Sequence, residues 1–283
     1  MGLTLNCASV IAKIKNKNYN GRVVCLGVPT TSLKKKHLVK YISTIYPEIN
    51  LKVLSALNDN DVISTKDFFY CLGYKEVVSV DINNYEGAEY ILDLNKDEVP
   101  DDLIESADLI YDTGTLEHIF NLRNALKIIH NTLKVNGIVL HVNPANQTLD
   151  HGFYQICPTY YRSYYDAANY DHVFGGLANL YTSVFNYVEI NKYKFDIYRT
   201  NGGIEHTKNL KPLYLYYASL KKKNSYIPDT VIQKYYNSKN ENKEYNYINF
   251  KNDRFILKRK GMDVVKEIIQ SFPFFVYLYR LLK

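Results

Sequence analysis

Three acidic residues each follow a short apolar segment of the chain. Asp81 and Asp112 end segments that are apolar almost throughout, and Asp93 stands near the end of a shorter one. An acid at the tip of a buried parallel strand can accept hydrogen bonds from both hydroxyls of a ribose, which is the role we expect for Asp81. Asp93 can accept a hydrogen bond from the exocyclic amine of adenine. Because the carboxyl ends of parallel strands meet at one edge of a sheet, the three acids predict a site for a nucleotide-like ligand.

A turn with a single glycine follows the first apolar segment. Gly27 ends this segment and precedes Val28–Ser32, whose hydroxyl groups can cap a helix. A glycine there permits the close backbone turn needed where the charged end of a cofactor approaches a helix N-terminus. The interval from Gly27 to Asp81 is more than twice the ~20 residues of a compact nucleotide-binding unit. Two explanations stay open: an insertion fills the interval, or the charged end of the ligand is held differently.

Histidines at the ends of predicted strands are the candidates for proton transfer. His118 follows the turn Asp112–Thr115, and His151 lies in a loop after a later strand. Imidazole titrates near physiological pH, so either residue can serve as the general base for a hydroxyl acceptor. Glu117 can fix a ligand amine or the start of a helix, and Tyr154 can hydrogen-bond an acceptor. The sequence therefore predicts that the second substrate, here called the acceptor, binds next to the part of the site that holds the nucleotide-like ligand.

Apolar segments and helical patterns alternate along the first 150 residues. We expect strands at 22–27, 77–81, 88–94, 107–112 and 138–142, the last containing a core histidine, His141, and helices at 33–46, 64–73 and 116–133. Such alternation predicts an α/β fold with a Rossmann-like, mostly parallel sheet that is covered by helices on both faces. Ligands bind such sheets at the carboxyl ends of the strands, where the strand order reverses.

The remaining segments have weaker patterns. Residues 1–20 are expected to form a lead-in without a regular element. A tyrosine-rich helix is expected at 158–169, strands at 187–198 and 214–220 with a polar loop between them, and a terminal helix at 263–283 after a polar stretch. We therefore predict one domain at 1–223, and at 224–283 a polar linker with a C-terminal helical extension.

Composition and charge exclude several classes of protein. The formal net charge is +6, but the lysines are scattered and no nucleic-acid-binding pattern accompanies them, so no nucleic acid is expected as a partner. The four cysteines form no CxxC pair, and no stretch approaches the ~20 apolar residues of a membrane span, so the cytoplasm is the expected location. No group of histidines, cysteines and acids has the chain spacing of a metal site, so no metal is expected.

Several segments together resemble class I S-adenosylmethionine (SAM)-dependent methyltransferases. These are Asp108–Ile119 with its sequence Asp-Leu-Ile-Tyr-Asp-Thr-Gly-Thr-Leu-Glu-His-Ile, the turn Leu133–Ile138 before a strand, Leu72–Ala88, Asp93–Asn95 and His151–Pro158. They are most similar to a bacterial branch of methyltransferase domains of the type 11 and type 12 kind. The resemblance covers roughly residues 22–170 and implies the seven-stranded methyltransferase form of the fold, with SAM as the cofactor.

The resemblance also implies roles for individual residues. Asp81 would bind the ribose with Ile82 against the adenine, and Asp93 and Leu94 would contact the base. Asp112, Thr113, Gly114 and Thr115 would border the methionine portion, where Gly27 and Glu117 also lie. The acceptor would be a small molecule, a nucleotide-linked sugar or a glycan, since many such enzymes act in biosynthetic or surface-polysaccharide pathways. A homodimer is one expected form of assembly.

Two other functions stay open. A methyltransferase-like binding or scaffold protein without turnover would explain the single glycine of the first turn. A nicotinamide-dependent oxidoreductase or epimerase would need a Gly-x-Gly-x-x-Gly turn after the first strand, which Gly27–Ser32 does not supply. We therefore expect a SAM-dependent methyltransferase that transfers a methyl group to an oxygen or nitrogen of its acceptor.

Overall fold

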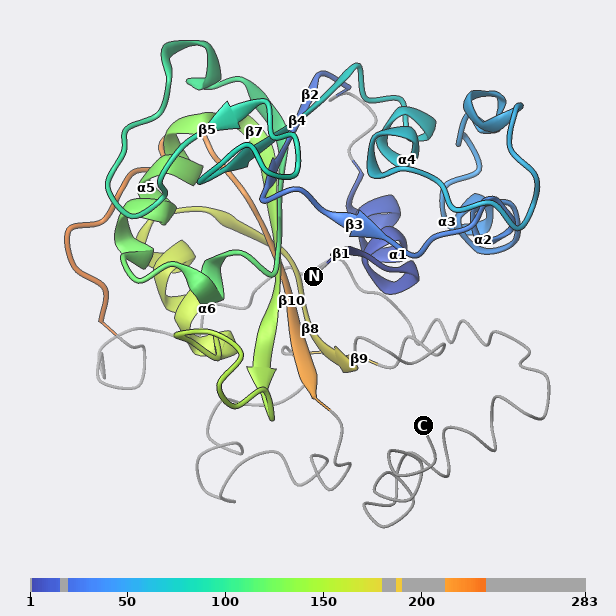
Figure 1. The fold of residues 1–283 in the computed structure, drawn as a ribbon. Coiled ribbons are helices and arrows are strands. Elements are labelled where there is room, and N and C mark those ends of the chain that lie inside the picture. Colours follow the sequence, from blue (N-terminus) through green and yellow to red (C-terminus); the bar gives the residue numbers. More distant parts are fainter. Residues whose placement is uncertain (1, 16–19, 180–186, 190–211, 233–283) are drawn as a thin grey trace.

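A computed structural model describes residues 2–15, 20–179, 187–189 and 212–232 of the chain (Figure 1). The strands are β1 (Gly2–Leu3), β2 (Arg22–Leu26), β3 (Thr30–Thr31), β4 (Glu76–Asp81), β5 (Tyr90–Ile91), β6 (Ala107–Thr113), β7 (Leu133–Asn146), β8 (Asp171–Asn179), β9 (Tyr187–Glu189) and β10 (Leu213–Leu220). The α-helices are α1 (Leu5–Ile14), α2 (Lys35–His37), α3 (Ser43–Ile45), α4 (Thr65–Cys71), α5 (Leu122–Thr132) and α6 (Pro158–Ala167). A π-helical turn, η1 (Leu38–Ile42), joins α2 to α3, and the 3₁₀ turns are η2 (Leu51–Leu54), η3 (Asp101–Leu103) and η4 (Leu116–His118).

Eight of these strands form one sheet in the order β5-β4-β2-β6-β7-β10-β8-β9. The first five are parallel to one another, whereas β10 lies antiparallel between β7 and β8, and β9 is antiparallel to β8. From β2 the chain proceeds outward to β4 and β5, and then returns to the other side of β2 to form β6 and β7. The strand order therefore reverses between β2 and β6, which is where a doubly wound sheet leaves a crevice at its carboxyl edge. The expected Rossmann-like, mostly parallel fold is confirmed.

The sheet is buried on both faces, which explains why its strands are apolar without interruption. In β2, Val23 and Cys25 pack on one face, and Val24 and Leu26 pack on the other. The first face is covered by α1, η1 and α4, and the second by α5 and α6, as Figure 1 shows. Successive residues of a strand thus alternate between the two halves of the core, one on each face of the sheet.

Most of the expected helices and strands are present, with shifted bounds. The helix expected at 64–73 is α4, and the side chain of its N-cap residue Ser64 accepts a hydrogen bond from the amide of Asp67. The strand expected at 88–94 contains only the two-residue β5. The helix expected at 116–133 begins later, because η4 ends at His118 and α5 starts at Leu122 behind its N-cap Asn121.

Among the elements that were not expected, the two longest are α1 and β8. The prediction of an irregular lead-in at 1–20 is wrong, because Leu5–Ile14 forms α1 and nearly every residue of this helix is buried. Its polar residues Asn6, Ser9 and Lys13 recur at helical spacing, but the helix is short and two of the three are buried, so it does not have the pattern of a surface helix. Strand β8 was also missed, since its centre contains Gly175 and Gly176, which are depleted in strands.

An insertion fills the long interval between Gly27 and Asp81. Residues 28–75 contain β3, the helical run from α2 through η1 to α3, η2 and α4, and β3 pairs with β1 in a small separate sheet. Of the two explanations for this interval, the structure therefore supports the insertion. It packs over the face of the large sheet that also carries α1 (Figure 1).

The described residues reach position 232, and the expected terminal helix at 263–283 lies outside them, as do most of the expected polar stretch and most of the strand at 187–198. The division of the chain after residue 223 thus stays a prediction. Residues just past it still contact the domain, since the amide of Tyr226 donates to the carbonyl of Ala168. Among the described residues, no helix is both long enough and apolar enough to cross a bilayer.

Candidate functional site

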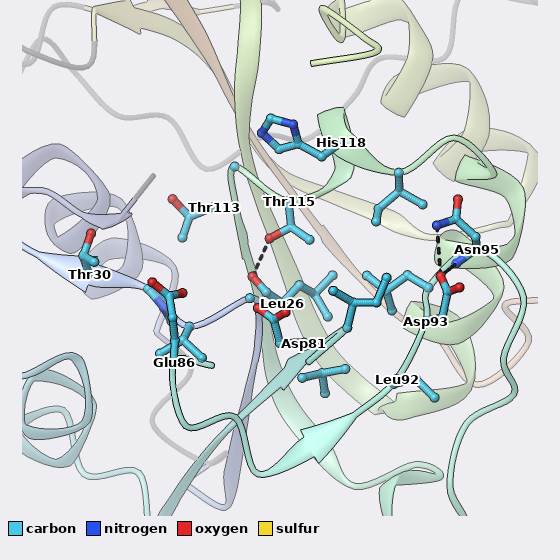
Figure 2. A pocket seen from close by; sticks show the side chains of 18 residues that line it. Leu26, Thr30, Asp81, Glu86, Leu92, Asp93, Asn95, Thr113, Thr115 and His118 are labelled. Carbon is cyan, nitrogen blue, oxygen red and sulfur yellow. Dashed lines mark hydrogen bonds between the residues drawn. The ribbon is translucent and has the colours of Figure 1, made fainter. Parts of the chain in front are cut away.

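A pocket of about 410 Å³ lies at the carboxyl ends of β2, β4 and β6, where the strand order reverses. Its size falls within the range of cofactor and small-ligand sites. It is lined by Leu26, Gly27, Val28, Pro29, Thr30, Val80, Asp81, Ile82, Glu86, Leu92, Asp93, Leu94, Asn95, Thr113, Gly114, Thr115, His118 and Ile119. Figure 2 shows the acidic and hydroxyl side chains arranged around this space, with His118 at its upper edge in that view. The pocket thus contains most of the residues that the sequence nominated.

The turn at Gly27 is tightly built in spite of its single glycine. The amide of Gly27 donates to the carbonyl of Val80, and the hydroxyl of Thr115 donates to the carbonyl of Leu26 at 2.6 Å. Gly27 has a positive φ of 75°, and a Cβ placed on it would lie 3.0 Å from Oγ1 of Thr115. A residue with a side chain would therefore be strained and would press on the wall of the pocket.

Asp81 is positioned to present its carboxylate next to this turn. It is the last residue of β4, and its carbonyl accepts a hydrogen bond from the amide of Leu92, which ties it to the chain after β5. One carboxylate oxygen accepts from the amide of Asn83 at 3.3 Å, whereas the other lies 4.0 Å from the Cβ position built on Gly27. Ile82 beside it is 61% exposed and offers an apolar surface at the rim. An acid and an apolar side chain in this arrangement suit a ribose with its base.

Asp93, Leu94 and Asn95 form the opposite wall. Oδ1 of Asp93 accepts hydrogen bonds from the backbone and side-chain nitrogens of Asn95, each at 2.9 Å. These two bonds hold the pKa of Asp93 below its usual value, and the bond from the backbone amide of Asn95 has the larger effect. Leu94 is buried beneath them. This wall therefore pairs a fixed carboxylate with an apolar floor.

Asp112 does not line the pocket. It is fully buried on the face of the sheet that carries α6. Its Oδ2 lies 2.8 Å from Nδ1 of His141, which is its paired residue on β7. Nδ2 of Asn143 donates to the same oxygen at 3.1 Å, and Nε2 of His141 lies 2.7 Å from the hydroxyl of Tyr165. Oδ1 accepts from the amides of Thr115 and Leu116. The carboxylate expected beside the methionine portion thus holds the turn 112–115 in shape from behind, while Thr113, Gly114 and Thr115 face the pocket.

Glu117, His151 and Tyr154 are not among the residues that line the pocket, whereas His118 is. His118 lines the pocket, and its pKa is lowered, first by burial and then by the nearby His151. Glu117 is fully buried and faces His151 rather than the pocket. Burial, followed by repulsion from Asp112, raises the pKa of Glu117 to about 7. Tyr154 donates its hydroxyl hydrogen bond to the carbonyl of Phe120, so this group is already engaged.

Sequence reasoning missed the buried polar network behind the site. Asn143 connects Asp112 to Glu117, and the hydroxyl of Tyr161 donates to the side-chain oxygen of Asn143 at 2.6 Å. Tyr161 also stacks on His141, with ring centroids 4.1 Å apart. A signal was present, because His141 and Asn143 lie two positions apart in an apolar strand and therefore share a face. Glu86 and Thr30, which also line the pocket, carried no comparable signal.

Gly27→Ala is expected to weaken the binding of the adenosyl ligand predicted from the sequence about tenfold or more, while leaving the protein folded. The new methyl group enters the wall at Thr115, and the positive φ costs roughly 1–2 kcal/mol. Calorimetric titration with S-adenosylhomocysteine, together with a urea unfolding curve, measures both effects. Gly87→Ala is the matched control, because Gly87 also has a positive φ but an added Cβ there meets nothing within 4 Å. Equal affinities for the two variants would show that the turn at Gly27 does not border the ligand.

No family model matches the chain, and no curated protein matches it. Solved structures similar to it include the 1,6-didemethyltoxoflavin-N1-methyltransferase of Burkholderia thailandensis, at 12% identity and a TM-score of 0.42, covering 77% of this chain and 78% of that one. A SAM-dependent methyltransferase of Mesorhizobium loti is similar at 10% identity and a TM-score of 0.39, covering 77% and 98%. An O-methyltransferase of a Brevibacillus brevis polyketide synthase is similar at 14% identity and a TM-score of 0.37, covering 77% and 71%.

These three proteins are methyltransferases, which is the kind of protein that the sequence resembles. Since the TM-scores are below 0.5 and the identities are low, no ligand or residue role is transferred from them. The strand order and the pocket at its reversal are observed in the structure of this chain itself. On that geometry, the chain belongs to the Rossmann-like class of α/β folds with a mostly parallel sheet.

Proposed function

We propose that the chain is a SAM-dependent methyltransferase that acts on an oxygen or nitrogen of a small-molecule or glycan-type acceptor. The observation that carries this proposal is that Gly27, Asp81 and Asp93, which end or follow three different strands, border one pocket at the strand-order reversal. Asp81 would accept hydrogen bonds from the ribose, with Ile82 and Leu94 against the adenine. Thr113, Gly114 and Thr115 would border the methionine portion.

These residues fit the cofactor's size and chemistry. The space above Gly27 is open only because this residue has no Cβ, which suits the close approach of a bulky ligand. When bound, SAM supplies a methyl group that its positive sulfur has already activated. The protein then has to align the acceptor with this methyl group and exclude water.

The acceptor would enter beside His118 and His151. Phe120 and Phe153 are exposed near these residues, with ring centroids 5.7 Å apart in an edge-to-face pair. An exposed aromatic pair next to a polar cluster suits an acceptor that has a ring with an apolar face, such as a sugar or a heterocycle. His118 and His151 remain the predicted proton acceptors, and Tyr154 the predicted acceptor contact.

Transfer of a labelled methyl group tests this proposal. Purified protein is incubated with SAM carrying an isotopic label in its methyl group and with metabolite or glycan extracts, and the products are searched by mass spectrometry for the gain of one CH₂. We expect a labelled product with the unaltered chain and far less of it with Asp81→Asn at the same limiting concentration of SAM. Label that stays in SAM with every extract, although S-adenosylhomocysteine binds, would support the alternative of a binding protein without turnover. The turn Gly27–Ser32 lacks the Gly-x-Gly-x-x-Gly pattern, which favours that alternative over a nicotinamide enzyme.

A further inference from the structure

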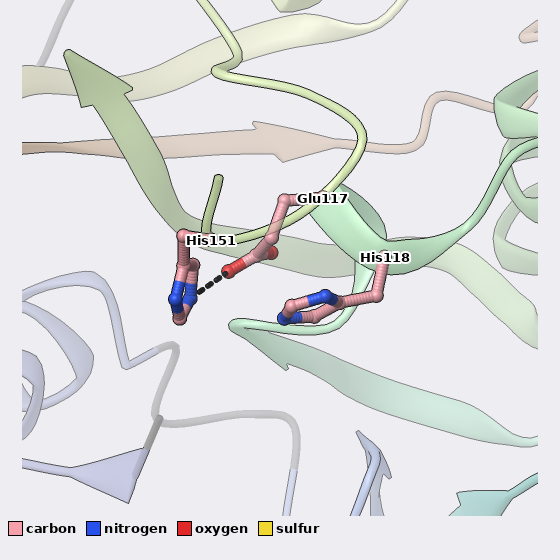
Figure 3. Close-up of side chains that lie close together, drawn as sticks. All are labelled: Glu117, His118 and His151. Carbon is pink, nitrogen blue, oxygen red and sulfur yellow. Dashed lines mark ion pairs between the residues drawn. The ribbon is translucent and has the colours of Figure 1, made fainter. Parts of the chain in front are cut away.

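Glu117, His118 and His151 form a cluster at the acceptor side of the pocket (the HHE cluster). One ligand atom from each residue lies within 4.8 Å of the others. Nε2 of His151 is 3.7 Å from Oε1 of Glu117, and the rings of His118 and His151 have centroids 5.1 Å apart. Figure 3 shows the carboxylate between the two imidazoles in that view. His151 lies far along the chain from the adjacent pair Glu117 and His118, which is why spacing along the sequence predicted no metal site.

The carboxylate of Glu117 is held in place, but only one of its two oxygens has a hydrogen-bond partner among the described residues. Its side chain has no exposed surface, and Nδ2 of Asn143 donates to Oε2 at 3.0 Å. Oε1 has no hydrogen-bond partner among the described residues. A buried carboxylate oxygen without a partner is costly, roughly 1–3 kcal/mol or more, unless a proton donor or a cation completes it. The free oxygen faces the two imidazoles, so a cation placed there would have three ligands.

The loop that carries His151 is held against the cluster by a glycine. A Cβ on Gly152 would lie 2.8 Å from the carbonyl oxygen of Glu117 and 3.1 Å from Nδ1 of His118. The amide of Tyr154 also donates to the carbonyl of Glu117. Only a residue without a side chain lets this loop approach η4 so closely. The loop and η4 therefore form one frame for the three side chains.

We propose that the HHE cluster binds one divalent transition-metal ion of the Zn²⁺ class through Glu117, His118 and His151. Two imidazoles and one carboxylate are the ligand set of catalytic zinc sites, which keep an open position for water or substrate. An ion at the centre of the three ligand atoms would lie no more than about 2.8 Å from each, against the ~2.0–2.2 Å of such bonds. Small rotations of the two exposed histidine side chains close this difference, while Asn143 keeps the carboxylate in place.

The catalytic role that we give to this ion rests on the proposed methyl transfer. A hydroxyl acceptor bound at the open position would lose its proton to solvent more readily, because the ion lowers the pKa of an oxygen bound to it. The acceptor oxygen would then form its bond to the methyl carbon as the bond from that carbon to sulfur breaks. In this account His118 and His151 act as metal ligands, in place of the general-base role expected from the sequence.

Titration with Zn²⁺ and Co²⁺ tests the site without any assay of methyl transfer. The chelator-treated full chain is titrated by calorimetry with Zn²⁺, and the visible absorption of Co²⁺ reports imidazole coordination. We expect one ion per chain, and a rise in Kd of about tenfold or more in His118→Ala and in His151→Ala. Glu117→Gln is expected to bind more weakly still. Circular dichroism confirms the folding of each variant, and the two histidine variants alter exposed side chains, so their fold is expected to persist.

Matched controls separate this site from other metal-binding groups. His37→Ala and Cys157→Ser, which remove a distant imidazole and an exposed thiol, are expected to bind with unchanged affinity. The proposal is overturned if the unaltered chain binds neither ion saturably, or if His118→Ala/His151→Ala binds as well as the unaltered chain. S-adenosylhomocysteine is titrated in parallel. Metal binding without nucleoside binding would sink the proposed function and leave the metal site standing, and the reverse result would do the opposite.

Discussion

Asp112→Ala is expected to lower the free energy of unfolding by about 3–5 kcal/mol, which is the largest stability effect predicted for any single side chain of the site. The carboxylate contacts His141 and Asn143 and accepts two backbone hydrogen bonds from Thr115 and Leu116. His141, Asn143 and Leu116 are fully buried, so removal of the carboxylate leaves buried donors without a partner. Because Asn143 also holds Glu117, the change should loosen the acceptor side as well.

Urea unfolding followed by circular dichroism measures this effect. Asp112→Asn keeps the volume and part of the hydrogen bonding, so it should lose less than the alanine variant. Asp101→Ala removes an exposed acid of η3 and should stay within about 0.5 kcal/mol of the unaltered chain. If Asp112→Ala unfolds at the same urea concentration as this control, the buried network does not stabilise the fold.

Asp81→Asn is expected to weaken the binding of S-adenosylhomocysteine about a hundredfold and to leave stability nearly unchanged. A carboxylate can accept hydrogen bonds from both ribose hydroxyls, whereas an amide offers one acceptor and turns a donor toward the second hydroxyl. A charged hydrogen bond contributes about 1.5–3 kcal/mol, and 2.8 kcal/mol corresponds to roughly a factor of a hundred in Kd. Among the described residues, the side chain of Asp81 has one long hydrogen bond, from the amide of Asn83.

Titration calorimetry of the two proteins gives the ratio of dissociation constants. Asp101→Asn serves as the control for a change of net charge without contact to the pocket. A ratio near one for Asp81→Asn would mean that this carboxylate does not meet the ligand. A large loss of stability in the same variant would mean that Asp81 acts through the fold instead.

The strands and the acids at their tips could be predicted because both signals are local. A strand buried on two faces must be apolar throughout, and an acid that follows it stands out, as Asp81 and Asp93 do. The pocket then follows from the strand order alone. The direction in which a tip residue points is not local, however. The side chain of Asp112 points to the face of the sheet that carries α6, where it meets His141 and Asn143 of β7. The sequence of β6 alone does not show which strand lies beside it.

The same reasoning explains the other residues that the sequence did not place. His118 and His151 were both nominated for the acceptor side, but their meeting over Glu117 depends on Gly152, whose importance lies in a contact with a distant turn. Helix α1 was not predicted because it is short and two of its three polar residues are buried by tertiary packing. Tertiary packing, rather than local preference, decided each of these cases.

Titration of the unaltered chain with S-adenosylhomocysteine tests the central claim, that the pocket between β2, β4 and β6 receives an adenosyl ligand. We predict saturable binding of one molecule per chain in the micromolar range, with no comparable binding of NAD. A chain that is folded by circular dichroism and gives no heat of binding at millimolar S-adenosylhomocysteine or SAM would contradict the claim.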